Sequence, residues 1–132
     1  MTEKRHDSEK LTLNLGYVDL GRIDLMVAEG FYANRSDFIR TAVRNQLASH
    51  ASTVEQSVGR KTMDLGVREF TRADLEAAVA AGQPLAIRVV GLVRLASDID
   101  SALALNAIES IEVLGALQAD ADLKTALAGR IR

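Results

Sequence analysis

A short run of alternating leucines near the start of the chain limits the folds that this sequence can adopt. Three leucines occupy every second position between Lys10 and Leu15, so a strand here has one apolar and one polar face. The apolar face holds Leu11, Leu13 and Leu15, and the polar face holds Lys10, Thr12 and Asn14. Between residues 16 and 58 no second strand pattern is present. Because an isolated strand cannot satisfy its backbone N–H and C=O groups, we expect a second copy of the chain to pair with it, antiparallel about a two-fold axis.

Two helical patterns follow this strand. The first starts near Asp19, an acid suited to a helix N-terminus, and runs to about Glu29, where Gly30 provides the left-handed residue that ends many helices. The second starts after Asn34, a side chain that accepts a hydrogen bond from an unpaired helical N–H, and runs to about Ser49. The sequence therefore predicts a strand and two helices in that order.

This order, together with the wording of residues 30–40, Gly-Phe-Tyr-Ala-Asn-Arg-Ser-Asp-Phe-Ile-Arg, resembles the ribbon-helix-helix family of DNA-binding proteins over about residues 10–48. The family's usual wording is a Gly and an aromatic or apolar residue, then Ser/Asn-Arg-Ser-Glu/Asp before an apolar pair and an Arg. The resemblance implies a dimeric transcriptional regulator, most often a repressor that occupies an operator. The chain departs from the family pattern at Gly21, inside the first helix, and lacks the Pro-Glu that commonly opens that helix.

A ribbon of two paired strands fits the major groove of double-stranded DNA, where base edges offer distinguishable donors and acceptors. We therefore expect base contacts from Lys10, Thr12 and Asn14. The N-terminus of the second helix suits a phosphate, so we expect phosphate contacts from Asn34, Arg35 and Ser36. The dimer core is predicted to contain Leu11, Leu13, Leu15, Ile23, Phe38, Ile39 and Val43. The alternative is that the polar strand face is merely solvated.

The charge balance gives no general affinity for nucleic acid. The net charge is −2, and residues 1–50 hold equal numbers of basic and acidic side chains. DNA binding must therefore depend on where the charges lie. Residues 1–9 are expected to form a flexible arm, although Lys4 and Arg5 would extend the contact with a DNA backbone if the arm bound it.

The second half of the chain is organised by a repeat of 24 residues. The segment 87–103 aligns without gaps on 111–127, with Gly91 over Gly115. Each copy has the pattern of a strand with a central Gly, followed by a short helix. We expect a linker at 50–59 and, from 60 to 132, a small solenoid-like α/β repeat domain, which gives an α+β protein overall.

The two repeats have an apolar middle on both faces of the predicted strands. One face is expected to form the core, with Ile87, Val89, Val93 and Leu95 stacked on Ile111, Val113, Leu117 and Ala119. The opposite face holds Val90, Leu92, Leu114 and Ala116, which we expect to form an oligomerisation surface. Two repeats are fewer than a solenoid normally needs, so the intact chain is expected to form an assembly larger than a dimer.

Several other functions are not supported by the residues. The chain has no Cys, which fits a reducing cytoplasm, and no apolar run approaches the roughly 20 residues that span a membrane. No catalytic set, phosphate loop or cofactor motif is present, so we expect neither enzymatic activity nor a cofactor. The acid pairs Asp98/Asp100 and Asp120/Asp122 are better explained as helix caps than as a cation site. Two alternatives remain, an antitoxin and an assembly protein that does not bind DNA.

Overall fold

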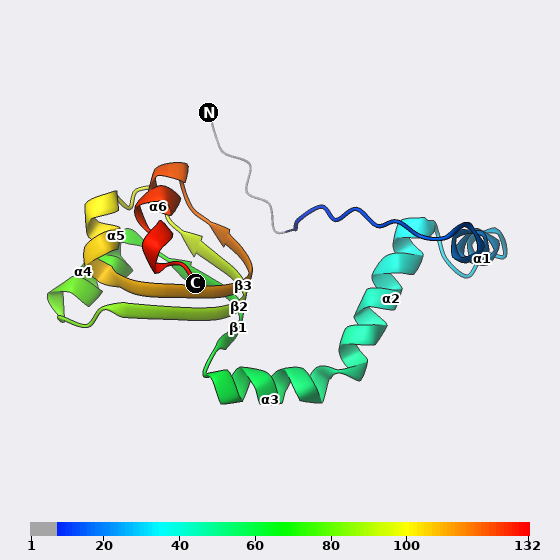
Figure 1. Cartoon of the computed structure of the whole chain (residues 1–132), viewed down its shortest axis with the longest axis horizontal. Helices are drawn as coiled ribbons and strands as arrows, with labels where there is room; N and C mark the ends of the chain where they lie inside the picture. Colours follow the sequence, from blue (N-terminus) through cyan, green and yellow to red (C-terminus); the bar gives the residue numbers. More distant parts are fainter. Residues whose placement is uncertain (1–7) are drawn as a thin grey trace. The chain divides into compact units, whose positions relative to one another are not determined.

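The computed structural model describes residues 8–132, which divide between Ala51 and Ser52 into two compact units (Figure 1). The N-terminal unit contains α1 (Tyr17–Ala28) and α2 (Arg35–Ser49), and α3 (Ala51–Lys61) begins at the division. The C-terminal unit continues with β1 (Asp64–Phe70), α4 (Arg72–Ala80), β2 (Leu85–Leu95), α5 (Ser101–Ala107), β3 (Ile108–Gln118), α6 (Ala121–Ala126) and a 3₁₀ turn (Ala128–Arg130). The predicted α+β class is confirmed.

Local signals define the two helices of the N-terminal unit. Asp19 lies in the first turn of α1, where a carboxylate is favourable near the positive end of the helix dipole. Gly30 has a φ of +86°, and its N–H donates to the Val27 carbonyl at 3.0 Å. The next N–H, of Phe31, donates to Met26 at 3.1 Å, which completes the hydrogen-bond pattern of a glycine-terminated helix. The predicted ends of α1 are therefore confirmed to within two residues.

The leucine segment is extended in the single chain and has no strand partner there. Residues 8–16 belong to no helix or strand, and Gly16, at the entry to α1, has an extended backbone with φ −63° and ψ 151°. In the described part of the chain the only sheet is β1-β2-β3. The predicted arm at 1–9, with Lys4 and Arg5, lies largely outside the described residues.

Residues 51–59 of the segment expected to be a linker, 50–59, are helical and form most of α3. The small polar residues of this segment favour a linker. However, Val54 and Val58 are spaced four apart, so they share one side of a helix, and both are partly buried. The helix ends at Thr62, whose φ is +55°, with the Met63 N–H donating to the Val58 carbonyl at 3.0 Å.

The sheet of the C-terminal unit is parallel throughout, in the order β1-β2-β3. The 24-residue repeat corresponds to the pairing of β2 with β3, because residues 24 apart lie opposite one another, as Ile87 and Ile111 do and as Gly91 and Gly115 do. The sequence analysis missed that β1 continues this register, with Gly66 opposite Gly91. The unit therefore contains three strand-helix pairs rather than two.

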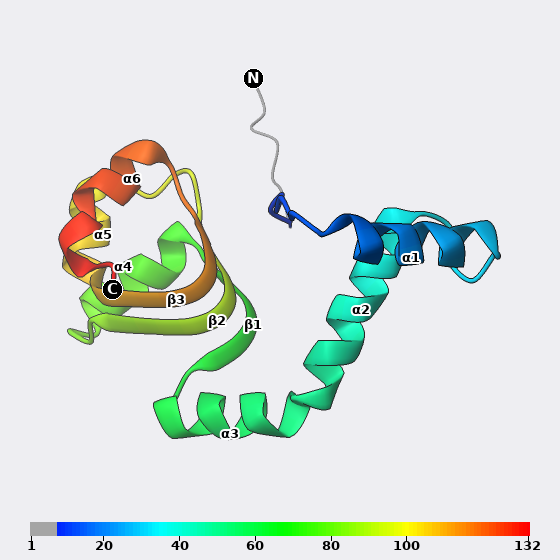
Figure 2. The same ribbon diagram turned by 45° about the vertical axis from the view of Figure 1, so that its right-hand side comes forward.

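The helices α4, α5 and α6 lie on the same side of the sheet in both ribbon views (Figures 1 and 2). They enclose a core with the inward side chains of the strands, and the predicted inward set of β2 is buried as expected. The core comprises Phe70, Leu75, Ala78, Ile87, Val89, Val93, Leu95, Ile99, Ala104, Ala107, Ile108, Ile111, Leu123 and Leu127. The expected solenoid is not shown, because the described residues form one three-stranded sheet with helices on a single face.

A row of three glycines crosses the sheet, one from each strand at matching register positions. Gly66, Gly91 and Gly115 have φ values of +129°, +136° and +124°, a region that side-chain-bearing residues rarely adopt. A Cβ at Gly91 would lie 2.1 Å from the Gly66 carbonyl oxygen, and one at Gly115 would lie 2.0 Å from that of Gly91. The close approach of the strands at this row therefore requires Gly at both positions.

Candidate nucleic-acid interface

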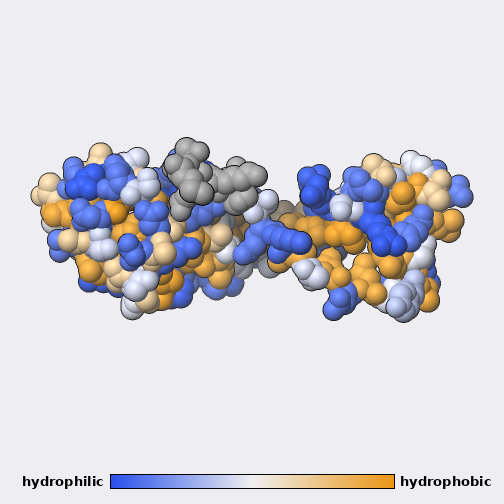
Figure 3. All heavy atoms as spheres, turned by 90° about the horizontal axis from the view of Figure 1, so that it is seen from above, coloured by the Kyte–Doolittle hydropathy of each residue, from blue (hydrophilic) through white to orange (hydrophobic). Residues whose placement is uncertain are grey.

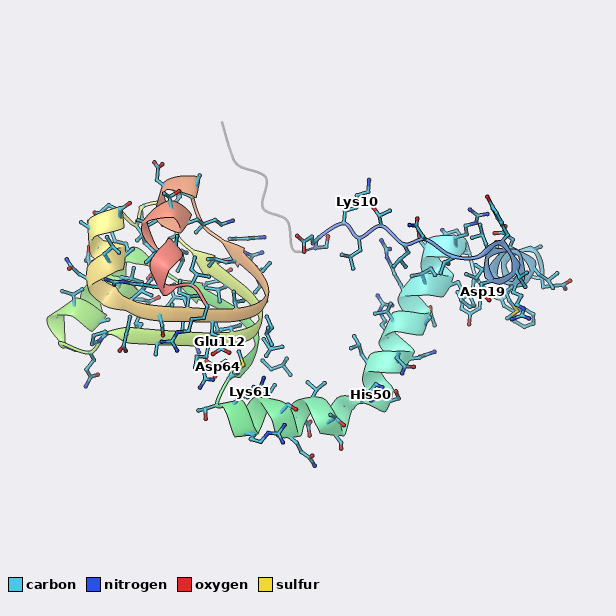
Figure 4. The ribbon with its side chains drawn as sticks, viewed as in Figure 1. Lys10, Asp19, His50, Lys61, Asp64 and Glu112 are labelled. Atoms are coloured by element: carbon cyan, nitrogen blue, oxygen red, sulfur yellow. The ribbon has the colours of Figure 1, made fainter. Side chains whose placement is uncertain are left out.

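The extended segment before α1 presents both of its side-chain sets to solvent in the single chain. Lys10, Thr12 and Asn14 are exposed, and Figure 4 shows the Lys10 side chain projecting from the segment. The intervening leucines are exposed as well, with Leu11 at 80% and Leu13 at 60% of full accessibility. Among residues 8–132, the apolar side of the segment is therefore left largely uncovered.

The two helices of the N-terminal unit also leave apolar side chains uncovered. Of the predicted core residues in these helices, Ile23 is buried, Phe38 and Ile39 are partly buried, and Val43 is 52% exposed. Tyr32 packs edge-on against Phe38, with ring centroids 4.8 Å apart. Figure 3 shows orange, apolar surface on the N-terminal unit, at the right of the view. Exposed apolar side chains that lie together often mark a site of protein–protein contact.

The start of α2 has the capping geometry that the sequence predicts. The Asn34 side-chain oxygen accepts from the Asp37 N–H at 2.8 Å, and an Asp37 carboxylate oxygen accepts from the Ala33 N–H at 2.9 Å. Ser36 is exposed beside them. The Asn34 oxygen is therefore occupied by the cap, which fixes the direction of the first turn of α2.

Arg35, a predicted phosphate contact, forms a two-bond ion pair with Asp24 of α1. Its Nε and Nη2 each lie 2.8 Å from one oxygen of that carboxylate. The hydrogen bond from Arg35 lowers the pKa of Asp24 and raises the pKa of Arg35. The pair joins the start of α2 to α1 across 11 residues of sequence, and sequence reasoning missed Asp24 because no local spacing rule connects the two positions.

Further basic side chains line the second helix. Arg40 and Arg44 lie one turn apart on α2, and both are exposed. Positions four apart in a helix project from the same side, so the two guanidinium groups can contact one polyanion together. The sequence analysis did not single them out, although this spacing was visible in it.

No cation site accompanies these groups. Residues 8–132 contain no cluster of three or more His, Cys, Asp or Glu side chains that could hold a metal ion. Asp100 accepts the Leu103 N–H at 2.7 Å as the cap of α5, and Asp122 lies in the first turn of α6. The predicted roles are therefore confirmed for Asp100 and Asp122, whereas Asp98 lies in the turn before α5 and Asp120, at the N-cap of α6, makes no side-chain cap hydrogen bond. Throughout the described range, no helix has both the length and the apolar character needed to cross a membrane.

Comparison with known protein families gives a match that covers nearly the whole chain. A family model described as the Ribbon-Helix-Helix transcriptional regulator family matches residues 6–124. The match extends well beyond the 10–48 segment that carries the resemblance and includes β1, β2 and β3. No curated protein and no solved structure matches the chain.

Proposed function

The chain belongs to the ribbon-helix-helix transcriptional regulator family, whose members bind DNA, usually as dimers, and on that premise we propose that it is a sequence-specific repressor. In this proposal two chains pair their leucine segments antiparallel into a two-stranded ribbon. The ribbon enters the major groove of an operator, and the bound dimer blocks transcription. The protein has no catalytic role in this proposal.

The single observation that carries the proposal is the double exposure of the segment before α1. Its leucines and its polar side chains are all accessible in one chain. Pairing of two segments satisfies their backbone N–H and C=O groups and covers the leucines with the helices of both chains. Lys10, Thr12 and Asn14 then project in duplicate from the opposite face. Asn side chains bond adenine edges in two places, and Lys reaches guanine acceptors.

The start of α2 supplies the positioning contacts in this proposal. Its first backbone N–H groups and positive dipole end suit a phosphate, with Ser36 exposed beside them. The ion pair with Asp24 uses two Arg35 donors and holds the start of α2 against α1. We infer that Arg35 acts on the phosphate partly by orienting this helix terminus.

The folded C-terminal unit favours a regulator over an antitoxin. An antitoxin tail is typically disordered until it wraps its toxin. Here residues 64–126 form a sheet and three helices around a continuous buried core. Resistance of this unit to a nonspecific protease in the absence of any partner would support the regulator.

A gel-shift competition tests the proposal directly. Full-length protein is expected to prefer duplex DNA from upstream of its own gene over random duplex near physiological salt. Asn14→Ala should weaken specific binding by about 5- to 150-fold, the effect of losing about 1–3 kcal/mol in one base contact. Asn106→Ala, at an exposed Asn on α5, serves as the matched control and should bind normally. No preference for the upstream duplex, together with no effect of Asn14→Ala, would refute the proposal.

A further inference from the structure

The sheet has an apolar face on the side away from α4, α5 and α6, here called the outer sheet face. It is made of two rows of three side chains, each with one residue from every strand. The rows are Leu65, Val90 and Leu114, and Val67, Leu92 and Ala116. Register partners in a sheet point to the same side, and alternation places these residues opposite the buried Val89 and Val93. All six side chains are apolar.

This face is open to solvent in the single chain. Leu65, Val67 and Leu114 are 61%, 59% and 55% exposed, and the other three members are partly buried. The helices α4, α5 and α6 all pack on the other side of the sheet. Parallel sheets almost always have both faces covered, so a partner for the outer sheet face is expected.

Charge at the ends of the outer sheet face indicates what kind of partner fits. At one end the Arg88 Nε lies 3.1 Å from a Glu112 carboxylate oxygen. At the other end Arg94 donates to Glu69 at 2.8 Å and to Gln118 at 3.0 Å. Both guanidinium groups of the central strand are therefore compensated by neighbouring strands. The face offers no excess of one sign to attract DNA or a strongly charged peptide, and it suits a surface that is equally neutral and apolar.

The size of the face further restricts its partner. Each strand contributes two outward side chains, which take up about four residues at about 3.3 Å rise, and the three strands lie at about 4.8 Å spacing, so the face measures roughly 200 Å². Stable interfaces between separate proteins bury about 800 Å² on each partner. A contact this small needs a partner that is held nearby, because tethering raises the effective concentration to about the millimolar range. A second copy joined through the N-terminal unit meets that condition.

We propose that the outer sheet face packs against the same face of a second copy of this chain. The contact is self-complementary, since an apolar centre meets an apolar centre and each Arg keeps its own carboxylate or amide partner. Its tethering rests on the dimer of the proposed function, whereas the choice of surface does not. The N-terminal unit would then bring the copies together, and the outer sheet face would form the second contact.

Chemical cross-linking tests this proposal, because the natural chain has no Cys and single cysteines can be placed at will. Leu92 lies on the central strand, β2. If the two-fold axis lies in the interface, either parallel or perpendicular to the strands, the central strands of the two copies are the strands that lie closest together. Full-length Leu92→Cys, treated with a short bis-maleimide, should give two-chain products at least about tenfold faster than Val79→Cys. Val79 is the matched control, since it is 44% exposed on α4, on the other side of the sheet. Equal rates for the two variants would overturn the proposal.

A second set of variants tests whether cross-linking at Leu92 depends on the outer sheet face rather than on chance encounters between the two cysteines. Adding Val67→Lys and Leu114→Lys to Leu92→Cys places charges at two exposed positions without disturbing the buried core, and should reduce cross-linking to the Val79→Cys rate. Adding Val79→Lys instead should leave cross-linking fast. Persistent cross-linking in the Val67→Lys/Leu114→Lys variant would also overturn the proposal. The gel shift of the Asn14 variant reports on the ribbon separately, so the two proposals fail in distinguishable ways.

Discussion

The two units of this chain solve the problem of burying apolar surface in different ways. In the C-terminal unit, three strands and three helices enclose a core in which Leu75, Val93 and Ile108 are fully buried. In the described part of the N-terminal unit, Ile23 is the only buried apolar side chain, while Leu13 and Val43 are more than half exposed. Both units contain side-chain-capped helices, with caps at Asn34 in one and at Thr71 and Asp100 in the other, so good local structure does not by itself provide a core.

We infer that the C-terminal unit folds by its own contacts, whereas the N-terminal unit is a half-structure completed by a second chain. A strand and two helices have too little mutual surface to offset the conformational entropy of ordering them. The C-terminal unit gains its core because three strand-helix pairs cover one another. We therefore expect changes in the N-terminal unit to act on assembly, and changes in the C-terminal core to act on folding.

The largest expected effect comes from placing a charge in the proposed dimer core. Leu13→Asp should abolish dimer formation at micromolar concentration, since burying an unpaired carboxylate costs several kcal/mol and each dimer would contain two. Thr12→Asp, one position away on the polar face, should leave the dimer intact and weaken DNA binding. Light scattering and gel shift on both variants measure this. If Leu13→Asp remained dimeric, the interpretation of the N-terminal unit as a half-structure would be wrong.

A cavity in the core of the C-terminal unit should lower the stability of that unit and leave DNA binding unchanged. Leu75 is fully buried in α4. Leu75→Ala should lower the free energy of unfolding of the C-terminal unit by about 2–5 kcal/mol, with no direct effect on the ribbon. Urea denaturation followed by circular dichroism gives the free energy, and gel shift under native conditions gives the DNA affinity. If the Leu75→Ala variant lost DNA binding under conditions in which it is fully folded, the two units would be coupled.

The glycine row offers a test within the C-terminal unit alone. Gly91→Ala should destabilise this unit by about 2–3 kcal/mol, because Ala is strained at this φ and its Cβ would collide with the Gly66 carbonyl. Gly59→Ala, in α3, has open space around the added Cβ and should stabilise the helix by about 0.5–1 kcal/mol. Thermal melts of the two variants should therefore shift in opposite directions. Equal shifts would contradict the close strand approach at the row.

The smallest expected effect concerns the ion pair that joins α1 to α2. The folded-state pKa of Asp24 is lowered from 3.8 by the hydrogen bond from Arg35. The stabilisation from this group is therefore complete above that pH, and is lost as the pH falls below 3.8 toward the folded-state value. Asp24→Asn should remove this part of the acid sensitivity of the N-terminal unit.

The control for this experiment is Asp19→Asn, whose carboxylate lies 3.8 Å from Arg22 in the same helix. Urea denaturation of both variants and the natural chain at neutral pH and near pH 3 gives the comparison. The Asp24→Asn variant should show the flatter pH dependence. A flatter profile for Asp19→Asn instead would mean that the Asp24–Arg35 pair does not stabilise the helix junction.

Much of the fold was predictable where the signal was local. The Asn34 cap, the end of α1 at Gly30 and the box formed by Thr71 and Asp74 at the start of α4 all depend on groups three or four residues apart. The β2–β3 register was predictable because the two strands have the same sequence pattern, 24 residues apart. The wording of β1 has diverged, and only the stacked position of Gly66 shows that it belongs to the same series.

Local sequence patterns were enough to place the ends of α1 and the start of α2, to show which face of β2 is buried, and to carry the family resemblance, whereas α3 was missed. Only the tertiary structure decided that three helices lie on one side of the sheet, that Leu65 and Val67 enlarge the outer sheet face, and that Arg35 pairs with Asp24. The physical reason is range. Caps and alternation act between neighbouring residues, whereas these features join groups 11 or more residues apart, whose proximity exists only after the chain has folded.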